Sequence, residues 1–572
     1  MLLKLLSAAA LGLGAAAPAW ARVPVEAPEA LGRLIDQYLP FLDEQKPAAL
    51  DAEARLRLLR RARREVADLL ATEGYFESRL EAVEDERGWR LVLTPGPRVQ
   101  IGQVELVFEG ELAGDGDERL RRRQDLEHAW KLPQGQPFRQ ADWDLAKQAL
   151  LDDVASRDYA AARITESHAA IDPATGQATL RVVLDSGPAY RFGELQARGL
   201  SDYPAELLQR YHPPVPGTPY RLDSLLRFQS ALQSTPYFAS VVADVVREGA
   251  DPQAAPILVQ VSEAKPRRVS LGLGASSNTG SRVEMGYRDA NLWGSANNLV
   301  SGLRLEQRRQ VGYTDLFLPP DRAGYQDSVG LLAEHTNISG LQTRRQALGL
   351  VRSIPTGIIE NRYALSFQQE LLAPEGSVET RRTALAANWS WTRRQVDDVL
   401  DPRDGQVLNF QLGGAARALL SDRNFVRLYG RYQGFWPVFR RDVLTLRAEV
   451  GINVAASRDG IPQDFLFRTG GAQTVRGYAY QSLGVKDGSA VVGGRYLAVT
   501  SAEYVHWFEG DWGLAAFVDA GNANDERKLF KLNLGYGIGP RWKSPAGPLA
   551  LDLAYGQSEH RLRLQFAVAI AF

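Results

Sequence analysis

The sequence predicts three α+β repeats followed by an all-β, 16-stranded transmembrane β-barrel. Three observations support this prediction. A secretory leader opens the chain, a helix-then-two-strands pattern recurs up to about residue 265, and apolar and polar residues alternate after it. We place the boundaries at 1–21 for the leader, at 22–97, 98–188 and 189–265 for the repeats, and at 266–572 for the barrel.

The composition excludes several classes of protein. The chain has 572 residues with 67 Lys plus Arg against 68 Asp plus Glu, so its formal net charge is −1. This balance does not fit a strongly basic nucleic-acid binder, and no nucleic acid is expected as a partner. With 45% hydrophobic residues the chain has enough apolar material to fold. The Cys count is 0, which excludes disulfides, thiolate metal sites and cysteine nucleophiles.

The first segment has the features of an export signal. Lys4 precedes a run rich in Leu and Ala, and Ala19-Trp20-Ala21 forms a small-residue cleavage site. The apolar run is too short to cross a membrane comfortably, so cleavage after Ala21 is favoured over a membrane anchor. We therefore expect an exported envelope protein.

The repeats are marked by aromatic residues that follow a helical stretch. These are Tyr75-Phe76, Tyr159 and Tyr237-Phe238, which lie 84 and 78 residues apart when counted from the tyrosines. Each unit reads as strand, helices, strand, strand. In the Arg-rich helix of the first repeat, helical spacing places one set of apolar residues on a common face: Leu56, Leu59, Val66 and Leu69.

The second half alternates apolar and polar residues. In the last strand, Leu562, Leu564 and Phe566 alternate with polar residues, which gives the strand one apolar face. We count 11 strands before Gly470 and five after it. A soluble sandwich produces the same alternation on one strand. The leader and the even strand count favour an outer-membrane barrel, whose tilted strands need about 9–11 residues each.

Several motifs in the second half resemble the BamA/TamA superfamily of outer-membrane assembly factors. They are Asp401-Pro402-Arg403-Asp404-Gly405, Gly470-Gly471-Ala472-Gln473-Thr474-Val475-Arg476-Gly477-Tyr478, Phe517-Val518-Asp519-Ala520-Gly521, Gly537-Ile538-Gly539-Pro540-Arg541-Trp542 and Pro545-Ala546-Gly547-Pro548-Leu549-Ala550-Leu551-Asp552. The repeats resemble the periplasmic POTRA domains of these proteins, and a count of three points to the TamA branch. The resemblance covers nearly the whole chain that follows the leader.

The resemblance implies a function and partners. It implies a subunit that inserts or translocates autotransporters and other outer-membrane proteins, with unfolded clients and outer-membrane lipid as its other contacts. It also implies an inner-membrane-anchored periplasmic partner similar to TamB, docked on the first POTRA domain. Whether the main task is protein insertion or phospholipid transport through that partner stays open.

The expected working element is a lateral seam between the first and last barrel strands. Gly272 and Gly274 weaken strand pairing, and an opened seam exposes backbone groups that template an incoming strand. The residues we expect at the seam are Leu271, Gly272, Leu273, Gly274, Phe566, Ile570 and Phe572.

The loop motif is the second expected site. By the resemblance, the long loop between strands 11 and 12 folds back into the lumen, where Arg476 needs a fixed acceptor. We expect Asp519 to fill this role, with Glu503 as a second acceptor. The other motif residues are Val475, Gly477 and Tyr478 on the loop, and Phe517 and Gly521 on the strand. The alternative is an ordinary surface turn with a solvated Arg476.

Three other functions are alternatives to this one. A two-partner secretion transporter of the same superfamily carries two POTRA domains rather than three. A passive outer-membrane channel needs neither the periplasmic arm nor the loop motif. A hydrolase needs a catalytic pair, and the six His residues stand in no catalytic pattern. We therefore expect no enzyme activity, catalytic residue, metal site or cofactor.

Overall fold

The computed structural model describes residues 23–42, 51–86, 88–399, 401–544 and 547–571. The predicted leader at 1–21 lies outside these residues. The chain divides into two compact units. One holds the first two repeats and part of the third, and the other holds the rest of the third repeat together with the barrel.

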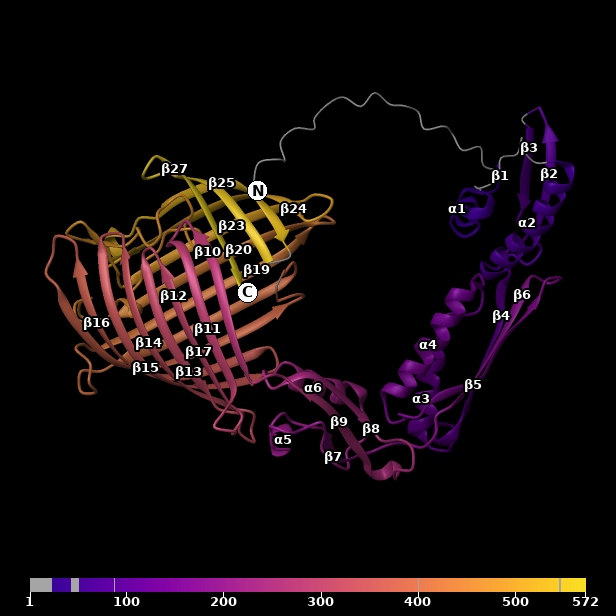
Figure 1. Ribbon diagram of the computed structural model, residues 1–572, viewed down its shortest axis with the longest axis horizontal. Coiled ribbons are helices and arrows are strands. Elements are labelled where there is room, and N and C mark those ends of the chain that lie inside the picture. Colours follow the sequence, from indigo (N-terminus) through magenta and orange to yellow (C-terminus); the bar gives the residue numbers. More distant parts are fainter. Residues whose placement is uncertain (1–22, 43–50, 87, 400, 545–546, 572) are drawn as a thin grey trace. The chain divides into compact units, whose positions relative to one another are not determined.

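Each repeat is a three-stranded sheet with helices between its first and second strands (Figure 1). The first repeat contains β1 (Val25–Glu26), α1 (Glu29–Tyr38), η1 (Pro40–Leu42), α2 (Ala52–Thr72), β2 (Arg79–Asp85) and β3 (Gly88–Thr94). The second contains β4 (Gln100–Glu109), η3 (Gly110–Ala113), α3 (Asp117–His128), α4 (Gln140–Ser156), β5 (Arg163–Asp172) and β6 (Gln177–Asp185). The third contains β7 (Phe192–Arg198), α5 (Glu206–Gln209), α6 (Leu222–Gln233), β8 (Phe238–Val245), η4 (Pro252–Ala254) and β9 (Ala255–Glu263).

The last strand of each repeat lies in the centre of its sheet. The strand orders are β1-β3-β2, β4-β6-β5 and β7-β9-β8. The first two strands of each repeat are therefore sheet edges, with backbone groups available for pairing. The strand–helices–strand–strand order predicted from the sequence is confirmed.

The buried face of the Arg-rich helix α2 overlaps the predicted one, since Val66 belongs to both and Leu59 and Leu69 pack partly against the same core. Leu58, Ala62, Val66 and Leu70, spaced four residues apart, are buried against the sheet. The prediction was wrong for Leu56, which is 49% exposed. Arg residues flank the Leu residues of α2, so two neighbouring faces of the helix are equally apolar in sequence. The face that contains the small Ala62 packs most closely against the sheet.

The third repeat contacts the first periplasmic turn of the barrel. The hydroxyl of Tyr237 donates to the carbonyl of Ala296 at 2.9 Å, and the side-chain amide of Asn291 donates to the carbonyl of Asp202 at 3.1 Å. The loop that carries Asp202 is in turn held by Glu263. These bonds couple the third repeat to the turn between β11 and β12, the second and third barrel strands.

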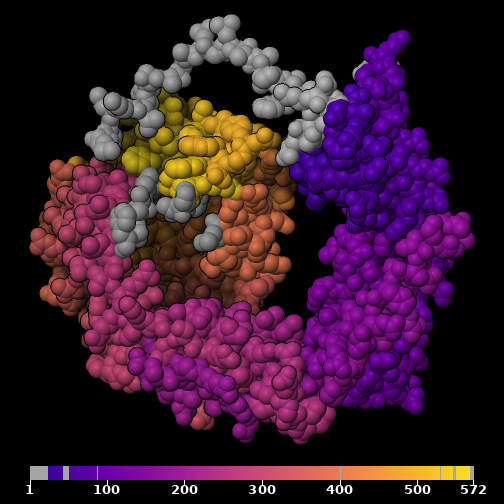
Figure 2. Space-filling view, turned by 45° about the vertical axis from the view of Figure 1, so that its right-hand side comes forward, coloured from indigo at the N-terminus to yellow at the C-terminus, as the bar shows by residue number. Residues whose placement is uncertain are grey.

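The barrel is closed by sixteen antiparallel strands, which confirms the predicted fold class. The strands are β10 (Arg267–Ser276), β11 (Gly280–Leu292), β12 (Asn297–Glu306), β13 (Arg309–Phe317), β14 (Gln326–Ile338), β15 (Leu341–Thr356), β16 (Ile359–Pro374), β17 (Thr380–Val396), β18 (Gly405–Ala415), β19 (Phe425–Val438), β20 (Asp442–Val454), β23 (Tyr496–Trp507), β24 (Trp512–Asn524), β25 (Asn533–Ser544), β26 (Gly547–Gly556) and β27 (Arg561–Ala571). Eleven strands precede Gly470 and five follow it, as predicted. The space-filling view shows that the barrel is hollow (Figure 2).

The barrel wall has two chemically different faces. On β10, Val269, Leu271 and Leu273 are 59%, 56% and 60% exposed and point outward, while the residues between them face the lumen. This is the pattern of a strand between lipid and a polar interior.

Among the described residues, no helix is long and apolar enough to cross a membrane.

The loop that joins β20 to β23 is the longest connection in the barrel. It runs over residues 455–495 and contains η5 (Gln463–Phe465), β21 (Val485–Asp487) and β22 (Ala490–Val492). The shorter connection between β24 and β25 contains η6 (Arg527–Leu529). The long loop carries the predicted Arg476 motif.

Candidate functional site in the barrel lumen and at the seam

Two glycines on the barrel wall allow the loop backbone to lie directly against it. A Cβ at Gly535 on β25 would lie 1.9 Å from the carbonyl oxygen of Arg476, and one at Gly556 on β26 would lie 2.5 Å from that of Gly477. No side chain fits in either place. Gly477 itself has a φ of +90°, a conformation that other residues rarely adopt. These glycines therefore permit the loop backbone to lie on the wall at this level.

Arg476 is bound to Asp519 on β24 by three hydrogen bonds. Its Nε donates to Oδ2 at 2.8 Å, its Nη2 donates to Oδ1 at 2.9 Å, and its backbone N–H donates to Oδ2 at 2.9 Å. Asp519 is fully buried and Arg476 is 6% exposed. A bidentate pair of this kind fixes both the position and the direction of the guanidinium group.

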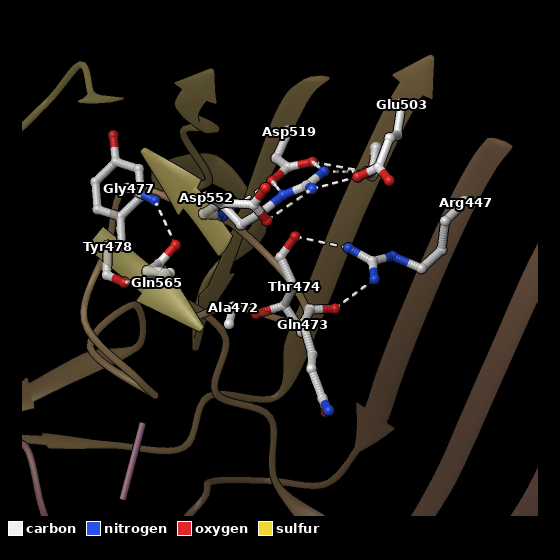
Figure 3. Close-up of polar contacts among 12 residues, drawn as sticks. Arg447, Ala472, Gln473, Thr474, Gly477, Tyr478, Glu503, Asp519, Asp552 and Gln565 are labelled. Atoms are coloured by element: carbon white, nitrogen blue, oxygen red, sulfur yellow. Dashed lines mark hydrogen bonds and ion pairs between the residues drawn. The ribbon is translucent and has the colours of Figure 1, made fainter. Parts of the chain in front are cut away.

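Further charged groups extend this pair across neighbouring strands. Glu503 on β23 accepts from Arg476, and it also accepts from Arg541 on β25 at 3.0 Å. Arg541 donates to Asp552 on β26 at 2.6 Å, and Asp552 lies 3.4 Å from Arg476 Nη1 (Figure 3). Two guanidinium groups and three carboxylates thus form one network in a partly dehydrated site, with each guanidinium group paired to more than one carboxylate and one negative charge in excess. We call these five residues the lumenal cluster.

The next two loop residues bind to the last strands. The N–H of Gly477 donates to Oε1 of Gln565 on β27 at 3.1 Å, and Nε2 of Gln565 donates to the carbonyl of Tyr478 at 2.8 Å (Figure 3). The hydroxyl of Tyr478 donates to the carbonyl of Leu534 at 2.9 Å, and the ring is fully buried. The loop is therefore attached to β27 itself.

The other side of the loop is held by Arg447 on β20. Its guanidinium group donates to the carbonyl of Gln473 and, at 2.7 Å, to the carbonyl of Thr474 (Figure 3). Farther along the loop, the N–H of Val491 donates to the carbonyl of Ser339 in the turn between β14 and β15 at 3.0 Å. The loop is thus fixed at both ends of its path through the lumen.

The remaining motif residues pack around the guanidinium group. The ring of Phe517 lies under Arg476, with 3.4 Å between the guanidinium carbon and the ring centroid. Val475 is fully buried, and a Cβ on Gly521 would lie 2.8 Å from its Cγ2 atom. The structure therefore brings Val475, Phe517 and Gly521 into contact with one another or with Arg476, beside both predicted acceptors.

The seam is a short ladder. Within the described part of β27, five Cα pairs join it to β10, from Gly272 with Ala571 to Ser276 with Ala567. By comparison, ten pairs join β10 to β11. The backbone N–H of Ser277 donates to the carbonyl of Phe566 at 2.9 Å at the extracellular end. The described residues give no β27 partner to the periplasmic part of β10, from Arg267 to Leu271.

The predicted seam residues fall unevenly on this ladder. Gly272, Leu273 and Gly274 pair with Ala571, Ile570 and Ala569. Leu271 lies one position beyond the last described pair, and Phe572 lies outside the described residues. Three of the predicted residues therefore stand in the ladder on the β10 side.

Sequence reasoning assigned no role to several residues of this site. These are Arg447, Ser501, Gly535, Arg541, Asp552, Gly556 and Gln565. A signal was present only for Asp552, which is the one charged residue of β26, and the strand pattern does not reveal its partner. Among the described residues, no group of three or more His, Cys, Asp or Glu side chains could hold a metal ion.

Fold and site together define an outer-membrane β-barrel that carries periplasmic α+β repeats and a lumenal loop. The chain belongs to the Omp85 superfamily, since residues 263–572, more than half of its length, match the Omp85 superfamily domain. Proteins of this family assemble or translocate outer-membrane proteins. The outer-membrane location and the assignment as a non-enzyme are thereby confirmed.

Individual relatives are distant in sequence. The outer membrane protein assembly factor BamA of Neisseria meningitidis serogroup B is 22% identical over 569 residues, covering 86% of this chain and 69% of that protein. The crystal structure of BamA from Haemophilus ducreyi lacking POTRA domains 1–3 superposes with a TM-score of 0.67 at 15% identity, covering 83% of this chain and all of that one. CdiB from Acinetobacter baumannii gives a TM-score of 0.48 at 15% identity, covering 91% of this chain and 98% of that one.

Proposed function

We propose that this chain is a TamA-type subunit that inserts autotransporters and other outer-membrane proteins through the seam between β10 and β27. The five-pair ladder is the observation that supports this most directly. A short ladder costs little free energy to open, and an open edge of β10 offers backbone groups to an incoming client strand. The count of three repeats supports the TamA branch.

The loop attachments support a seam that opens on one side only. The lumenal cluster draws its acceptors and donors from β23, β24, β25 and β26, and Gln565 adds β27. The loop thus ties the last five strands together. On the β10 side, the loop is joined to the turn between β10 and β11. The N–H of Ala472 donates to Oδ1 of Asn278 in this turn at 3.3 Å. We infer that β23 to β27 move as one body and that β10 separates from it.

The first repeat is the proposed docking site for an inner-membrane-anchored periplasmic partner similar to TamB. The edge strands of the repeat sheets, such as β2, offer unpaired backbone groups that an extended partner segment can join. Cross-linking from Glu81 on β2 in whole envelopes, followed by identification of the captured protein, tests this assignment. Recovery of client proteins alone would contradict it.

The insertion activity is tested by reconstitution. The full chain in lipid vesicles should accelerate the folding of an added autotransporter barrel, measured as protease-protected, heat-modifiable protein, relative to vesicles that hold a passive porin. A folding rate equal to that of the porin vesicles would contradict the proposal. Export of one soluble protein without barrel insertion would instead indicate the two-partner secretion alternative.

A further inference from the structure

The outer wall of strands β13 to β17 carries a chemical gradient from cationic to apolar. These five strands are neighbours in the barrel (Figure 1). Cross-strand pairing aligns their outward residues in rows. The row nearest the extracellular side contains Gln310, His335, Arg344, Leu371 and Arg381. The second row contains Gly312, Ala333, Gln346, Gln369 and Thr383, and the third contains Thr314, Leu331, Leu348, Phe367 and Leu385.

These rows face away from the lumen. Leu331 and Leu348 of the third row are 57% and 44% exposed on the outside of the barrel. Since side chains alternate along a strand, Arg344 and Gln346 share the outward face of β15 with Leu348. The third row therefore faces lipid, and the first row lies closer to the headgroups on the extracellular side, where β15 begins.

The two arginines of the first row are close together and their charges are not compensated. Arg344 and Arg381 both stand beside Leu371, which places their Cα atoms about 10 Å apart, two strand spacings. Arg381 donates to the neutral Oε1 of Gln369 at 2.7 Å, and Arg344 has no ion pair among the described residues. The next residue, Arg345, faces the lumen and pairs with Glu334 at 2.8 Å.

The wall is also hollowed at this place. A groove of about 550 Å³ is lined by Arg344, Gln346, Gln369 and Arg381. A second groove of about 680 Å³ is lined by Leu331, Leu348 and Phe367 and shares Gln346 and Gln369 with the first. A groove that holds both outward arginines thus continues into an apolar one.

We propose that this groove binds an outer-leaflet lipid that carries phosphate on its headgroup. The phosphate accepts hydrogen bonds from Arg344 and Arg381, with Gln346 beside them, and the acyl chains lie over Leu331, Leu348 and Phe367. An uncompensated guanidinium group near lipid is costly, and a phosphate supplies both the missing charge and the acceptor oxygens. Charge and shape therefore favour the same occupant.

Native mass spectrometry of the full chain in detergent tests this proposal. With bisphosphorylated lipid A as the probe, the wild type should retain lipid, and the double variant Arg344→Gln/Arg381→Gln should retain at least tenfold less. Arg344→Lys/Arg381→Lys should retain an intermediate amount because the charge persists. Arg393→Gln is the matched control, since Arg393 also faces outward, on β17, but near the periplasmic end.

Two further arms separate the lipid from other sources of phosphate. Lipid A without phosphate should bind at least tenfold more weakly, and inorganic phosphate should not displace the bound lipid, because it makes no contact with the apolar groove. Equal retention by the Arg→Gln double variant would overturn the proposal. So would equal binding of the phosphate-free lipid, or displacement by inorganic phosphate alone.

Discussion

Arg476 of the lumenal loop and Asp519 of the barrel wall form three hydrogen bonds with each other, two through the guanidinium group and one through the backbone N–H of the arginine. The backbone bond means that the aspartate fixes the loop itself and not only the side chain. Gln565 in turn attaches the loop to β27, the strand that closes the seam. The pair therefore links the conformation of the loop to the last barrel strand.

Replacing Arg476 by Lys should abolish most insertion activity while the barrel stays folded. A lysine ammonium keeps the charge but cannot make the bidentate bond to Asp519 while also reaching Glu503. The measurement is client folding in vesicles, with heat-modifiability of the variant as the folding check. Arg431→Lys is the control, because the side chain of Arg431 is 43% exposed and its Nε atom lies 3.8 Å from the carboxylate of Glu449. Wild-type activity in Arg476→Lys would show that the bidentate bond to Asp519 is not required for client insertion.

A double-mutant cycle on Arg476→Ala and Asp519→Ala measures the coupling of the pair. Removing one partner from a buried ion pair costs about 3–5 kcal/mol, since the other charge is left uncompensated. We expect the double variant to lose less than the sum of the two single variants, in urea unfolding of the barrel or in protease resistance of the loop. Strict additivity would mean that the two residues act independently.

The variant Gly535→Ala should displace the loop without removing any polar group. The added Cβ would lie 1.9 Å from the carbonyl oxygen of Arg476, so either the loop or β25 must shift. Overpacking of this kind costs about 1–3 kcal/mol. Gly349→Ala is the matched control, because a Cβ at that strand position meets no atom within 4 Å. Limited proteolysis of the loop should be faster in the first variant only, and equal rates would refute the close-approach argument.

Glu263 should make the third repeat sensitive to acid. Burial opposes the charge of Glu263, but hydrogen bonds from Ser201 and from the N–H groups of Asp202 and Tyr203 outweigh this and lower the pKa of Glu263 below its usual value of 4.5. A lowered folded-state pKa stabilises the fold above the unfolded-state value, and that stability is lost as the pH falls through the folded-state pKa.

Hydrogen exchange of the amides at 201–203 measures this effect. Their protection factors should be high at neutral pH, fall in the wild type as the pH drops through the lowered pKa of Glu263, and be low at every pH in Glu263→Gln. Glu194→Gln, an exposed residue on β7, serves as control. Unchanged protection in Glu263→Gln would show that the carboxylate does not hold this loop.

The sequence predicted the fold more completely than the site. Strand alternation and the repeat pattern depend on local periodicity, so the three sheets and sixteen strands could be read directly. The pairing of Arg476 with Asp519 could be expected from one motif on the loop and one on a strand, and Glu503 was expected as a second acceptor outside these motifs. Arg541 and Asp552 could not be assigned, because the depth at which strands align across a barrel depends on its shear, which no local pattern reports.

A disulfide across the seam tests the central claim most directly. The natural chain contains 0 Cys, so introduced cysteines have no competitors. Ala275 stands opposite Val568 on β27 and opposite Ser281 on β11. The pair Ala275→Cys/Val568→Cys closes the seam when oxidised, and Ala275→Cys/Ser281→Cys closes an ordinary strand pair with the same first cysteine.

Client folding in vesicles is measured with both variants before and after reduction. The seam variant should be inactive when oxidised and recover when reduced, and the β10–β11 variant should be active in both states. Full activity of the oxidised seam variant would contradict insertion through an opening between β10 and β27.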